Sequence, residues 1–148
     1  MTYYDTGVLV KLYVPELGSQ GVLRFVSERG MAIQVNDLQY GEATNAFALK
    51  AFRQEISTAE RLALRAKWEG DFSAGRLRQR SLAWPEVFQQ GNMLTEAHSL
   101  QIGCRTLDIL HVAAALVLHA TEFVTLDDRQ RRLALAAGLN TVSLSPLE

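Results

Sequence analysis

The chain has 148 residues, enough for one ordinary domain with a sizeable core. Hydrophobic residues make up 48% and charged residues 21% of the chain, which is typical of folded proteins and excludes large-scale disorder. The net charge of −1 argues against a uniformly basic nucleic-acid binder, and the single cysteine, Cys104, excludes an intramolecular disulfide and a zinc cage built of cysteines.

Short strand patterns alternate with helical patterns along the chain. Strands are predicted at residues 2–5, 31–35, 81–84, 122–125 and 141–144. Helices are predicted at residues 18–30, 37–53, 57 to about 75, 85 to about 103, 107–120 and 127–137. This alternation predicts an α/β fold with a mainly parallel sheet. Because no linker, repeat or low-complexity segment interrupts it, we expect a single domain over residues 1–148.

Local signals mark several of the helix starts. Asn36 closes the second predicted strand and opens a helix, and Ser57 with Glu60 forms a capping-box pattern. Pro85 suits the first turn of the next helix, and Thr106 suits the N-cap of a helix that is apolar on nearly every side. We expect that last helix to be buried.

The sequence shows no secretion signal and no membrane segment. The N-terminus lacks a charged region followed by a long apolar region, and the longest apolar run, residues 109–118, is interrupted by His111. We therefore expect a soluble cytoplasmic protein without a membrane partner.

The helix predicted at residues 37–53 carries an unusual stripe. Leu38, Leu49 and Phe52 recur at steps of three and four, and Glu42 and Asn45 occupy the same stripe. A carboxylate on a core-facing stripe must be paired, solvated at an edge or bound to a cation. The alternative is a glutamate that reaches solvent from an early turn of the helix.

Three further acids are predicted at strand ends or helix starts. Asp5 follows the first strand, Asp108 lies in the first turn of the apolar helix, and Asp127 follows the strand at residues 122–125, with Asp128 as a competitor beside it. Each has an ordinary explanation, because acids cap helices and are favoured by the helix dipole. Their joint placement is what suggests a site.

Parallel strands end at one edge of a sheet, so we expect Asp5, Glu42, Asp108 and Asp127 to converge. Carboxylates brought together repel one another unless positive charge compensates. Mg²⁺ or Mn²⁺ supplies that charge, takes oxygen ligands and can activate a water against a phosphodiester. The sequence therefore predicts metal-dependent phosphodiester hydrolysis.

Other readings of the same residues are less favoured. Asp5-Thr6-Gly7 is the tripeptide of acid proteases, but those proteins are nearly all β, need a flap and use two such aspartates, whereas this chain has one. His111 stands three residues after Asp108, yet an imidazole among Ala, Val and Leu is more often a core or interface residue than a metal ligand. No zincin, Walker A or dinucleotide-binding pattern occurs.

Arginines cluster in "GRLRQR" and "DDRQRR", and Arg105 precedes the Asp108 helix. These side chains are candidates for contact with RNA phosphates, and solvated helix faces are the alternative. Arg105 is the best candidate because it is close in sequence to a predicted metal ligand.

Four stretches in order resemble one family: "YYDTGVLVKLYVPE", "LQYGEATNAF", "RTLDILHVAAAL" and "FVTLDDRQRRLALAAGL". The chain resembles PIN-domain ribonucleases and, among these, VapC-type toxins of type II toxin–antitoxin modules. The resemblance implies a three-layer α/β/α sandwich with a central, mainly parallel sheet. It also implies a Mg²⁺ or Mn²⁺ site made by Asp5, Glu42, Asp108 and Asp127. Asp127 matches the Thr-x-Asp pattern of the family better than Asp128 does.

The resemblance further implies an endoribonuclease that cuts tRNA or rRNA, leaves 5′-phosphate and 3′-hydroxyl ends, is silenced by a cognate antitoxin and forms homodimers. One position departs from the family, where Ser or Asn commonly follows the Asp-Thr pair and this chain has Gly7. The side chain at that position supports the acidic cluster by hydrogen bonding, and water or Thr6 is its expected substitute. A non-catalytic PIN-like module that binds RNA or protein is the alternative function.

Overall fold

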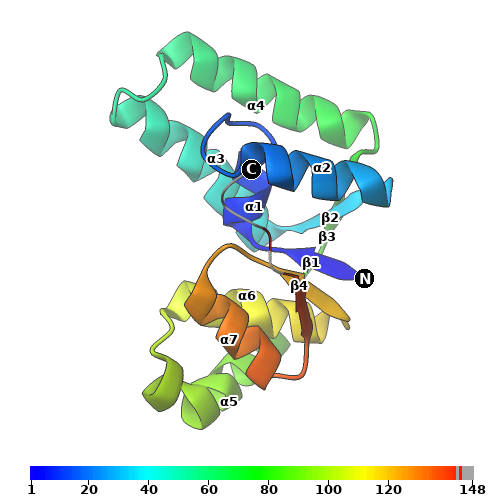
Figure 1. The fold of residues 1–148 in the computed structure, drawn as a ribbon, viewed down its shortest axis with the longest axis vertical. Coiled ribbons are helices and arrows are strands. Elements are labelled where there is room, and N and C mark those ends of the chain that lie inside the picture. The colour runs from blue at the N-terminus through cyan, green and yellow to red at the C-terminus, as the bar shows by residue number, and fades with distance from the viewer. Residues whose placement is uncertain (143, 145–148) are drawn as a thin grey trace. The chain divides into compact units, whose positions relative to one another are not determined.

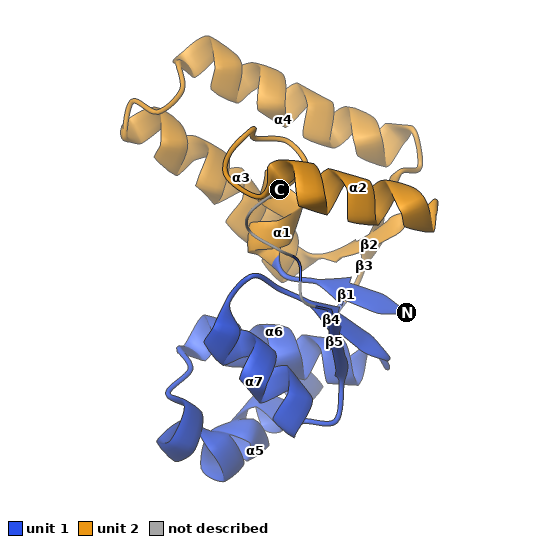
Figure 2. Cartoon of the chain, viewed as in Figure 1, with its two compact units in different colours: residues 1–5, 82–144 blue, residues 6–81, 145–148 orange. Residues whose placement is uncertain are grey.

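The computed structural model describes residues 1–142 and 144. These residues form two compact units, which Figure 2 shows in two colours. Unit 1 comprises Met1–Asp5 and Leu82–Leu144, and unit 2 comprises Thr6–Ser81. Within the described ranges, no helix combines the length and the apolar character needed to cross a bilayer.

Unit 1 is built on a three-stranded parallel sheet with the strand order β1-β4-β5. Its elements, in chain order, are β1 (Thr2–Tyr4), α5 (Trp84–Ile102), α6 (Thr106–Val117), β4 (Glu122–Val124), α7 (Asp128–Ala136) and β5 (Asn140–Val142). Tyr4 is paired with Val124, and Val124 with Val142, so the three strands run in one direction and end at one edge (Figure 1). Helix α7 packs on β4 and β5 and also contacts α5 and α6.

Helix α6 forms the centre of unit 1, as its apolar sequence predicts. Every side chain from Ile109 to Ala115 is buried. Helix α5 packs along it, and Gly91 of α5 lies at the contact, where a Cβ would meet a methyl group of Leu110 at 3.4 Å and one of Ile109 at 3.8 Å, both ordinary van der Waals distances. On the sheet side, the ring of Tyr3 stacks on that of Phe123 at 5.3 Å.

Unit 2 is mainly helical and contains a two-stranded parallel sheet, β2-β3. Its elements are α1 (Thr6–Lys11), α2 (Ser19–Arg29), β2 (Ile33–Asn36), α3 (Asp37–Phe52), α4 (Thr58–Ser73) and β3 (Leu77–Arg80). Helix α3 packs against α1, α4 and β2. The core includes an aromatic cluster in which Trp68 meets Tyr13 at 5.2 Å and Phe47 at 6.2 Å, both edge-on.

The predicted helix starts in unit 2 are confirmed by their hydrogen bonds. Asn36 and Gln39 form a reciprocal capping box at the start of α3, and Ser57 and Glu60 form another at the start of α4. These contacts span three residues, so the local sequence is sufficient to specify them.

The predicted core face of α3 is wrong. Leu49 and Phe52 are 38% and 83% exposed, and the buried side chains of the helix are Gln39, Ala43 and Phe47. The buried face is the one that meets α1, α4 and β2, so tertiary packing decides it and not the spacing of the leucines. Glu42 therefore lies beside the buried face and not on a core-facing stripe.

The strand predicted at residues 81–84 is also misplaced. The strand in this region is β3, at residues 77–80. It is paired in parallel with residues 33–36 of β2, so that Leu77 lies opposite Ile33. Only the first residue of β3 is buried, so the strand has no alternating pattern to read. Helix α1 was not assigned from the sequence, and the last predicted strand, residues 141–144, is found as Asn140–Val142, with residue 143 outside the described residues.

Candidate acidic metal site

Asp5 and Asp127 follow neighbouring parallel strands of unit 1. Tyr4 of β1 is paired with Val124 of β4, and the backbone N–H of Asp5 donates a 2.8 Å hydrogen bond to the carbonyl of Val124. Asp127 lies three residues beyond the end of β4. Both acids therefore lie at the carboxyl edge of this sheet, where parallel α/β folds place their ligand sites.

The Asp127 carboxylate is held by the start of α7. Its Oδ1 accepts hydrogen bonds from the backbone N–H groups of Arg129 (2.8 Å) and Gln130 (3.0 Å), so Asp127 is the N-cap of the helix. The buried hydroxyl of Thr125 accepts from the N–H of Asp127 at 3.1 Å and donates to Oε1 of Gln130 at 2.7 Å. The Thr-x-Asp pattern thus places a buried hydrogen-bond network beneath one carboxylate.

Asp128 differs from its neighbour. Its side chain is 68% exposed and pairs with Arg131 at 2.5 Å, one turn along α7. Asp127 is half-buried and engaged by backbone N–H groups. The geometry therefore favours Asp127 over Asp128 as a site residue.

Asp108 is the third residue of α6. Its Oδ2 accepts a 3.0 Å hydrogen bond from the backbone N–H of Arg105, so the N-cap of this helix is Arg105 and not Thr106 as predicted. The carboxylate closes the first turn and is half-buried. It therefore lies at the positive end of the helix dipole.

The half-buried thiol of Cys104 is close to two of the acids. Burial raises the pKa of this thiol, and the negative charges of Asp108 and Asp127 raise it further, while Arg129 and Arg132 act in the opposite direction. The sulfur also contacts the carbonyl oxygen of Arg129 at 3.4 Å. Asp108 and Asp127, at the starts of α6 and α7, thus both act electrostatically on this one sulfur atom.

Asp5 faces a buried histidine. Oδ1 of Asp5 lies 3.9 Å from Nε2 of His111, one turn after Asp108 on α6. The predicted core role of His111 is confirmed, since its side chain is 3% exposed. Asp5 and Asp108 thus both lie beside the first turns of α6.

Glu42 belongs to unit 2, on α3. Its Oε2 accepts a 2.7 Å hydrogen bond from the hydroxyl of Thr6, the first residue of α1. Thr6 is also the residue that follows Asp5 in the sequence. The Thr6 hydroxyl, the expected substitute for the side chain that Gly7 lacks, thus donates to Glu42.

The donor chemistry of these residues fits a hard divalent cation. In unit 1, Asp5, Asp108 and Asp127 supply carboxylate oxygens, and the capping hydrogen bonds engage one oxygen each of Asp108 and Asp127. Over residues 1–142 and 144, no three His, Cys, Asp or Glu side chains are grouped closely enough to hold a metal by themselves. Mg²⁺ does not need such a cage, because it usually keeps several waters and binds one or two carboxylates.

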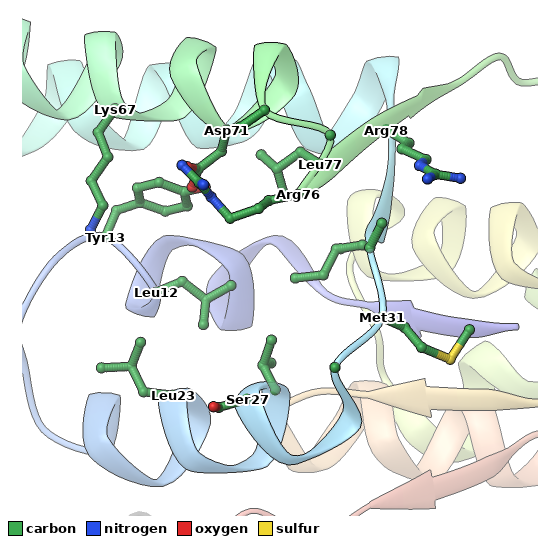
Figure 3. Close-up of a pocket in the computed structure, with 16 residues that line it drawn as sticks. Leu12, Tyr13, Leu23, Ser27, Met31, Lys67, Asp71, Arg76, Leu77 and Arg78 are labelled. Carbon is green, nitrogen blue, oxygen red and sulfur yellow. The ribbon is translucent and has the colours of Figure 1, made fainter.

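A separate cavity lies in unit 2. Its volume is about 610 Å³, and its walls come from the two residues after α1, from α2 and the start of β2, and from α4 and β3 (Figure 3). Inside it, the hydroxyl of Tyr13 donates to Asp71 at 2.6 Å, Arg76 pairs with Asp71, and Lys67 lies 5.3 Å from the centre of the Tyr13 ring. None of the four predicted ligands lines this cavity, so it is separate from the acidic site.

The arginine clusters are distributed over different elements. Arg105 is exposed at the start of α6, beside Asp108. Arg78 and Arg80 are exposed on strand β3, which corrects the alternative that placed them on a helix face. Arg76 pairs with Asp71.

Sequence reasoning missed the residues that support the acids. Gln130 is 1% exposed and anchors Thr125, and its position three residues after Asp127 is a helix-start signal that could have identified it. Tyr3 gives no such signal, because its partner His111 is 108 residues away in the sequence.

Comparison with known proteins bears on the fold. The sequence matches no protein-family model and no curated protein. The structure is similar to a chain of FitAcB from Neisseria gonorrhoeae, with a TM-score of 0.68 and 16% sequence identity over 99% of this chain and 98% of that chain. FitAcB is a toxin–antitoxin complex whose FitB component is a PIN-domain protein. The chain thus has a PIN-like fold, and the predicted class, a three-layer α/β/α sandwich with a mainly parallel sheet, is confirmed.

Proposed function

We propose that the protein is a Mg²⁺- or Mn²⁺-dependent endoribonuclease of the PIN class and the toxin of a VapBC-type toxin–antitoxin module. The observation that carries the proposal is the set of carboxylates at the carboxyl edge of the unit 1 sheet and at the starts of α6 and α7. The PIN-like fold supports it. Such a toxin acts in the cytoplasm, where its RNA substrates are.

In this proposal Asp5, Glu42, Asp108 and Asp127 hold the ion. The ion supplies positive charge to the phosphate and lowers the pKa of the attacking water. The chain itself provides orientation: the network beneath Asp127 and the Thr6 hydroxyl on Glu42 limit the motion of these carboxylates. Arg105 contacts the RNA backbone.

The central experiment compares RNA cleavage by wild type, Asp5→Asn and Asp108→Asn, each with Mn²⁺ and with EDTA, using the exposed Asp128→Asn as the matched control. We expect both site variants and EDTA to reduce cleavage by about 100-fold or more, because loss of even an outer-shell partner typically costs about 10–100-fold. Asp128→Asn should cleave like wild type. Equal cleavage by every sample would exclude the proposal. tRNA, rRNA fragments and branched DNA, digested side by side, would identify the substrate class.

A non-catalytic PIN-like module that binds RNA or protein is the second candidate. Two observations favour it: Gly7 replaces the supporting side chain expected from the family resemblance, and the described residues contain no ready-made group of three metal-binding side chains. Calorimetric titration with Mn²⁺ separates the two functions. No heat of binding at millimolar metal would favour the non-catalytic module.

An antitoxin is the proposed protein partner, because the similar structure is that of a toxin–antitoxin complex. On unit 2, Leu49 and Phe52 of α3 expose apolar surface that such a partner, or a second copy of the chain in a homodimer, would cover. Co-expression with the product of a small adjacent gene for a DNA-binding protein tests this. Cleavage should be suppressed in the complex, and sedimentation of the isolated chain would report its oligomeric state.

A further inference from the structure

We propose that Tyr3 and His111 are positioning residues: they form a buried pair that orients the Asp5 carboxylate. The effect on metal binding rests on the proposed function. The relay itself, a hydrogen bond from Tyr3 to His111 followed by a charge contact from His111 to Asp5, does not, and it can be measured without metal or RNA.

The three residues form a short chain within unit 1. The hydroxyl of Tyr3 lies 2.9 Å from Nδ1 of His111, and Nε2 of the same ring lies 3.9 Å from Oδ1 of Asp5. Tyr3 and His111 are each 2% exposed. The imidazole of His111 thus lies between the buried Tyr3 hydroxyl and the Asp5 carboxylate.

The position of the protons follows from the donors and acceptors. A neutral imidazole has one N–H donor and one acceptor nitrogen, whereas a tyrosine hydroxyl can donate or accept. If His111 donated from Nδ1 to Tyr3, the lone pair on Nε2 would face the negative carboxylate of Asp5. If the hydroxyl of Tyr3 donates to Nδ1, the proton lies on Nε2 and its positive end faces Asp5. The second arrangement is the favourable one, so Tyr3 selects the tautomer that attracts Asp5.

The contact between His111 and Asp5 acts by charge and not by a formed hydrogen bond, since 3.9 Å exceeds hydrogen-bond distance. A low-dielectric surrounding strengthens such an interaction. Histidines that ligate metals are commonly oriented by a carboxylate on their second nitrogen. Here the relation is reversed, with the histidine orienting a carboxylate.

The pair is held rigidly by its neighbours. The ring of Tyr3 stacks on Phe123 with an interplanar angle of 7° and meets the ring of His111 edge-on at 68°. The backbone of Asp5 is fixed by its hydrogen bond to Val124. A ring with so little freedom can direct a carboxylate, whereas an exposed histidine would not.

The first test is the tautomer of His111, measured by long-range ¹H–¹⁵N correlation NMR in EDTA at a pH of about 8, where an ordinary imidazole is neutral. We expect the Nε2–H form in wild type and a shift toward a mixture in Tyr3→Phe. Tyr13→Phe, which removes a buried hydroxyl from unit 2, should leave the signal unchanged. An Nδ1–H form in wild type, or no change in Tyr3→Phe, would overturn the proposal.

The second test is the Mn²⁺ affinity of wild type, Tyr3→Phe and His111→Gln by calorimetry, with His98→Gln on α5 as the control. We expect about 10- to 100-fold weaker binding in the two site variants and none of this loss in the control. For RNA cleavage, kcat should fall while KM is unchanged. If the pair is only structural, the urea midpoint falls and the Mn²⁺ affinity of the folded variant stays that of wild type, which would overturn the positioning role.

These results separate the two proposals. Wild type that binds no Mn²⁺ and cleaves no RNA would end the proposed function, and with it the effect of the pair on metal. The tautomer experiment would still confirm or reject the relay. If wild type binds Mn²⁺ and the Tyr3→Phe and His111→Gln variants bind it with the same affinity, the relay has no role in metal binding. The proposed function would then remain intact.

Discussion

The hydroxyl of Thr6 donates a 2.7 Å hydrogen bond to Oε2 of Glu42, and Thr6 directly follows Asp5 in the chain. The side chain of Thr6 is buried and that of Glu42 is half-buried. Thr6 thus follows Asp5 in the backbone, and its hydroxyl binds Glu42 on α3. This contact is independent of position 7, where the chain has glycine.

Thr6→Val should therefore impair the site, while Thr6→Ser should not. Valine keeps the shape of threonine but removes this donor from Oε2 of Glu42, and a hydrogen bond to a charged group contributes about 1.5–3 kcal/mol. We expect a reduction in RNA cleavage of about tenfold for Thr6→Val, the effect of about 1.4 kcal/mol on a barrier. Single-turnover cleavage rates and urea unfolding measure the two effects. Equal rates for the valine and serine variants would show that the hydroxyl has no role.

The neighbouring acids Asp127 and Asp128 provide a matched pair of variants. Asparagine is as good an N-cap as aspartate, so Asp127→Asn should keep α7 intact while removing one negative charge from the site. We expect Asp127→Asn to lose Mn²⁺ affinity and cleavage with little change in the urea midpoint. Asp128→Asn loses only an exposed ion pair, worth about 0–1 kcal/mol, and should remain active. The reverse order of activities would assign the site to Asp128.

Arg105→Gln should weaken RNA binding without affecting the metal. Arg105 is exposed at the start of α6, three residues before Asp108, and its proposed partner is an RNA phosphate. Removing one phosphate contact should lower the slope of log affinity against log salt by about 0.7–0.9. Fluorescence anisotropy with labelled RNA at several salt concentrations gives this slope. Arg53→Gln, an exposed arginine at the end of α3, is the control, and an equal change in both variants would indicate a general charge effect.

The ion pairs of Glu16 should make unit 2 sensitive to acid. Burial raises the pKa of Glu16, but hydrogen bonds from Lys11 and Lys50, at 2.8 and 2.9 Å, outweigh it and leave this pKa below its usual value. A carboxyl group whose pKa is lower in the folded than in the unfolded protein stabilises the folded state at pH values above its unfolded-state pKa. This stabilisation is lost as the pH falls through its folded-state pKa. The stability difference between wild type and Glu16→Gln should therefore be full at a pH of about 7 and should shrink as the pH falls below the ordinary glutamate pKa of about 4.3.

Urea unfolding across this pH range measures the difference. Glu28→Gln, at an exposed position on α2, is the control and should show no such dependence. A difference for Glu16→Gln that grows as the pH falls would contradict the assignment, because it would require a raised pKa.

Gly91 should tolerate alanine but not leucine. A Cβ at this position meets Leu110, Ile109 and Ala113 of α6 at 3.4 to 3.9 Å, which is van der Waals contact. Alanine should stabilise α5 by up to about 1 kcal/mol through helix propensity, and leucine should destabilise the protein by about 1–3 kcal/mol through overpacking. Thermal unfolding ranks the three proteins, and a leucine variant as stable as wild type would show that the two helices can separate.

The sequence by itself determined the features that depend on contacts within one turn. The capping boxes of Asn36 with Gln39 and of Ser57 with Glu60, and the burial of α6, follow from neighbours three or four residues apart. The placement of Asp108 and Asp127 at helix starts has the same origin. Such interactions form in any chain with these residues, so pattern and spacing predict them.

Only the tertiary structure decided the partners of the acids. The hydrogen bond between Thr6 and Glu42 spans 36 residues, and the one between Tyr3 and His111 spans 108, so neither leaves a periodic signal. The same holds for the pairing of β3 with β2 and for the buried face of α3, where packing against other elements overrides the spacing of Leu49 and Phe52. Contacts between distant segments depend on how the whole chain packs, and local spacing does not encode that packing.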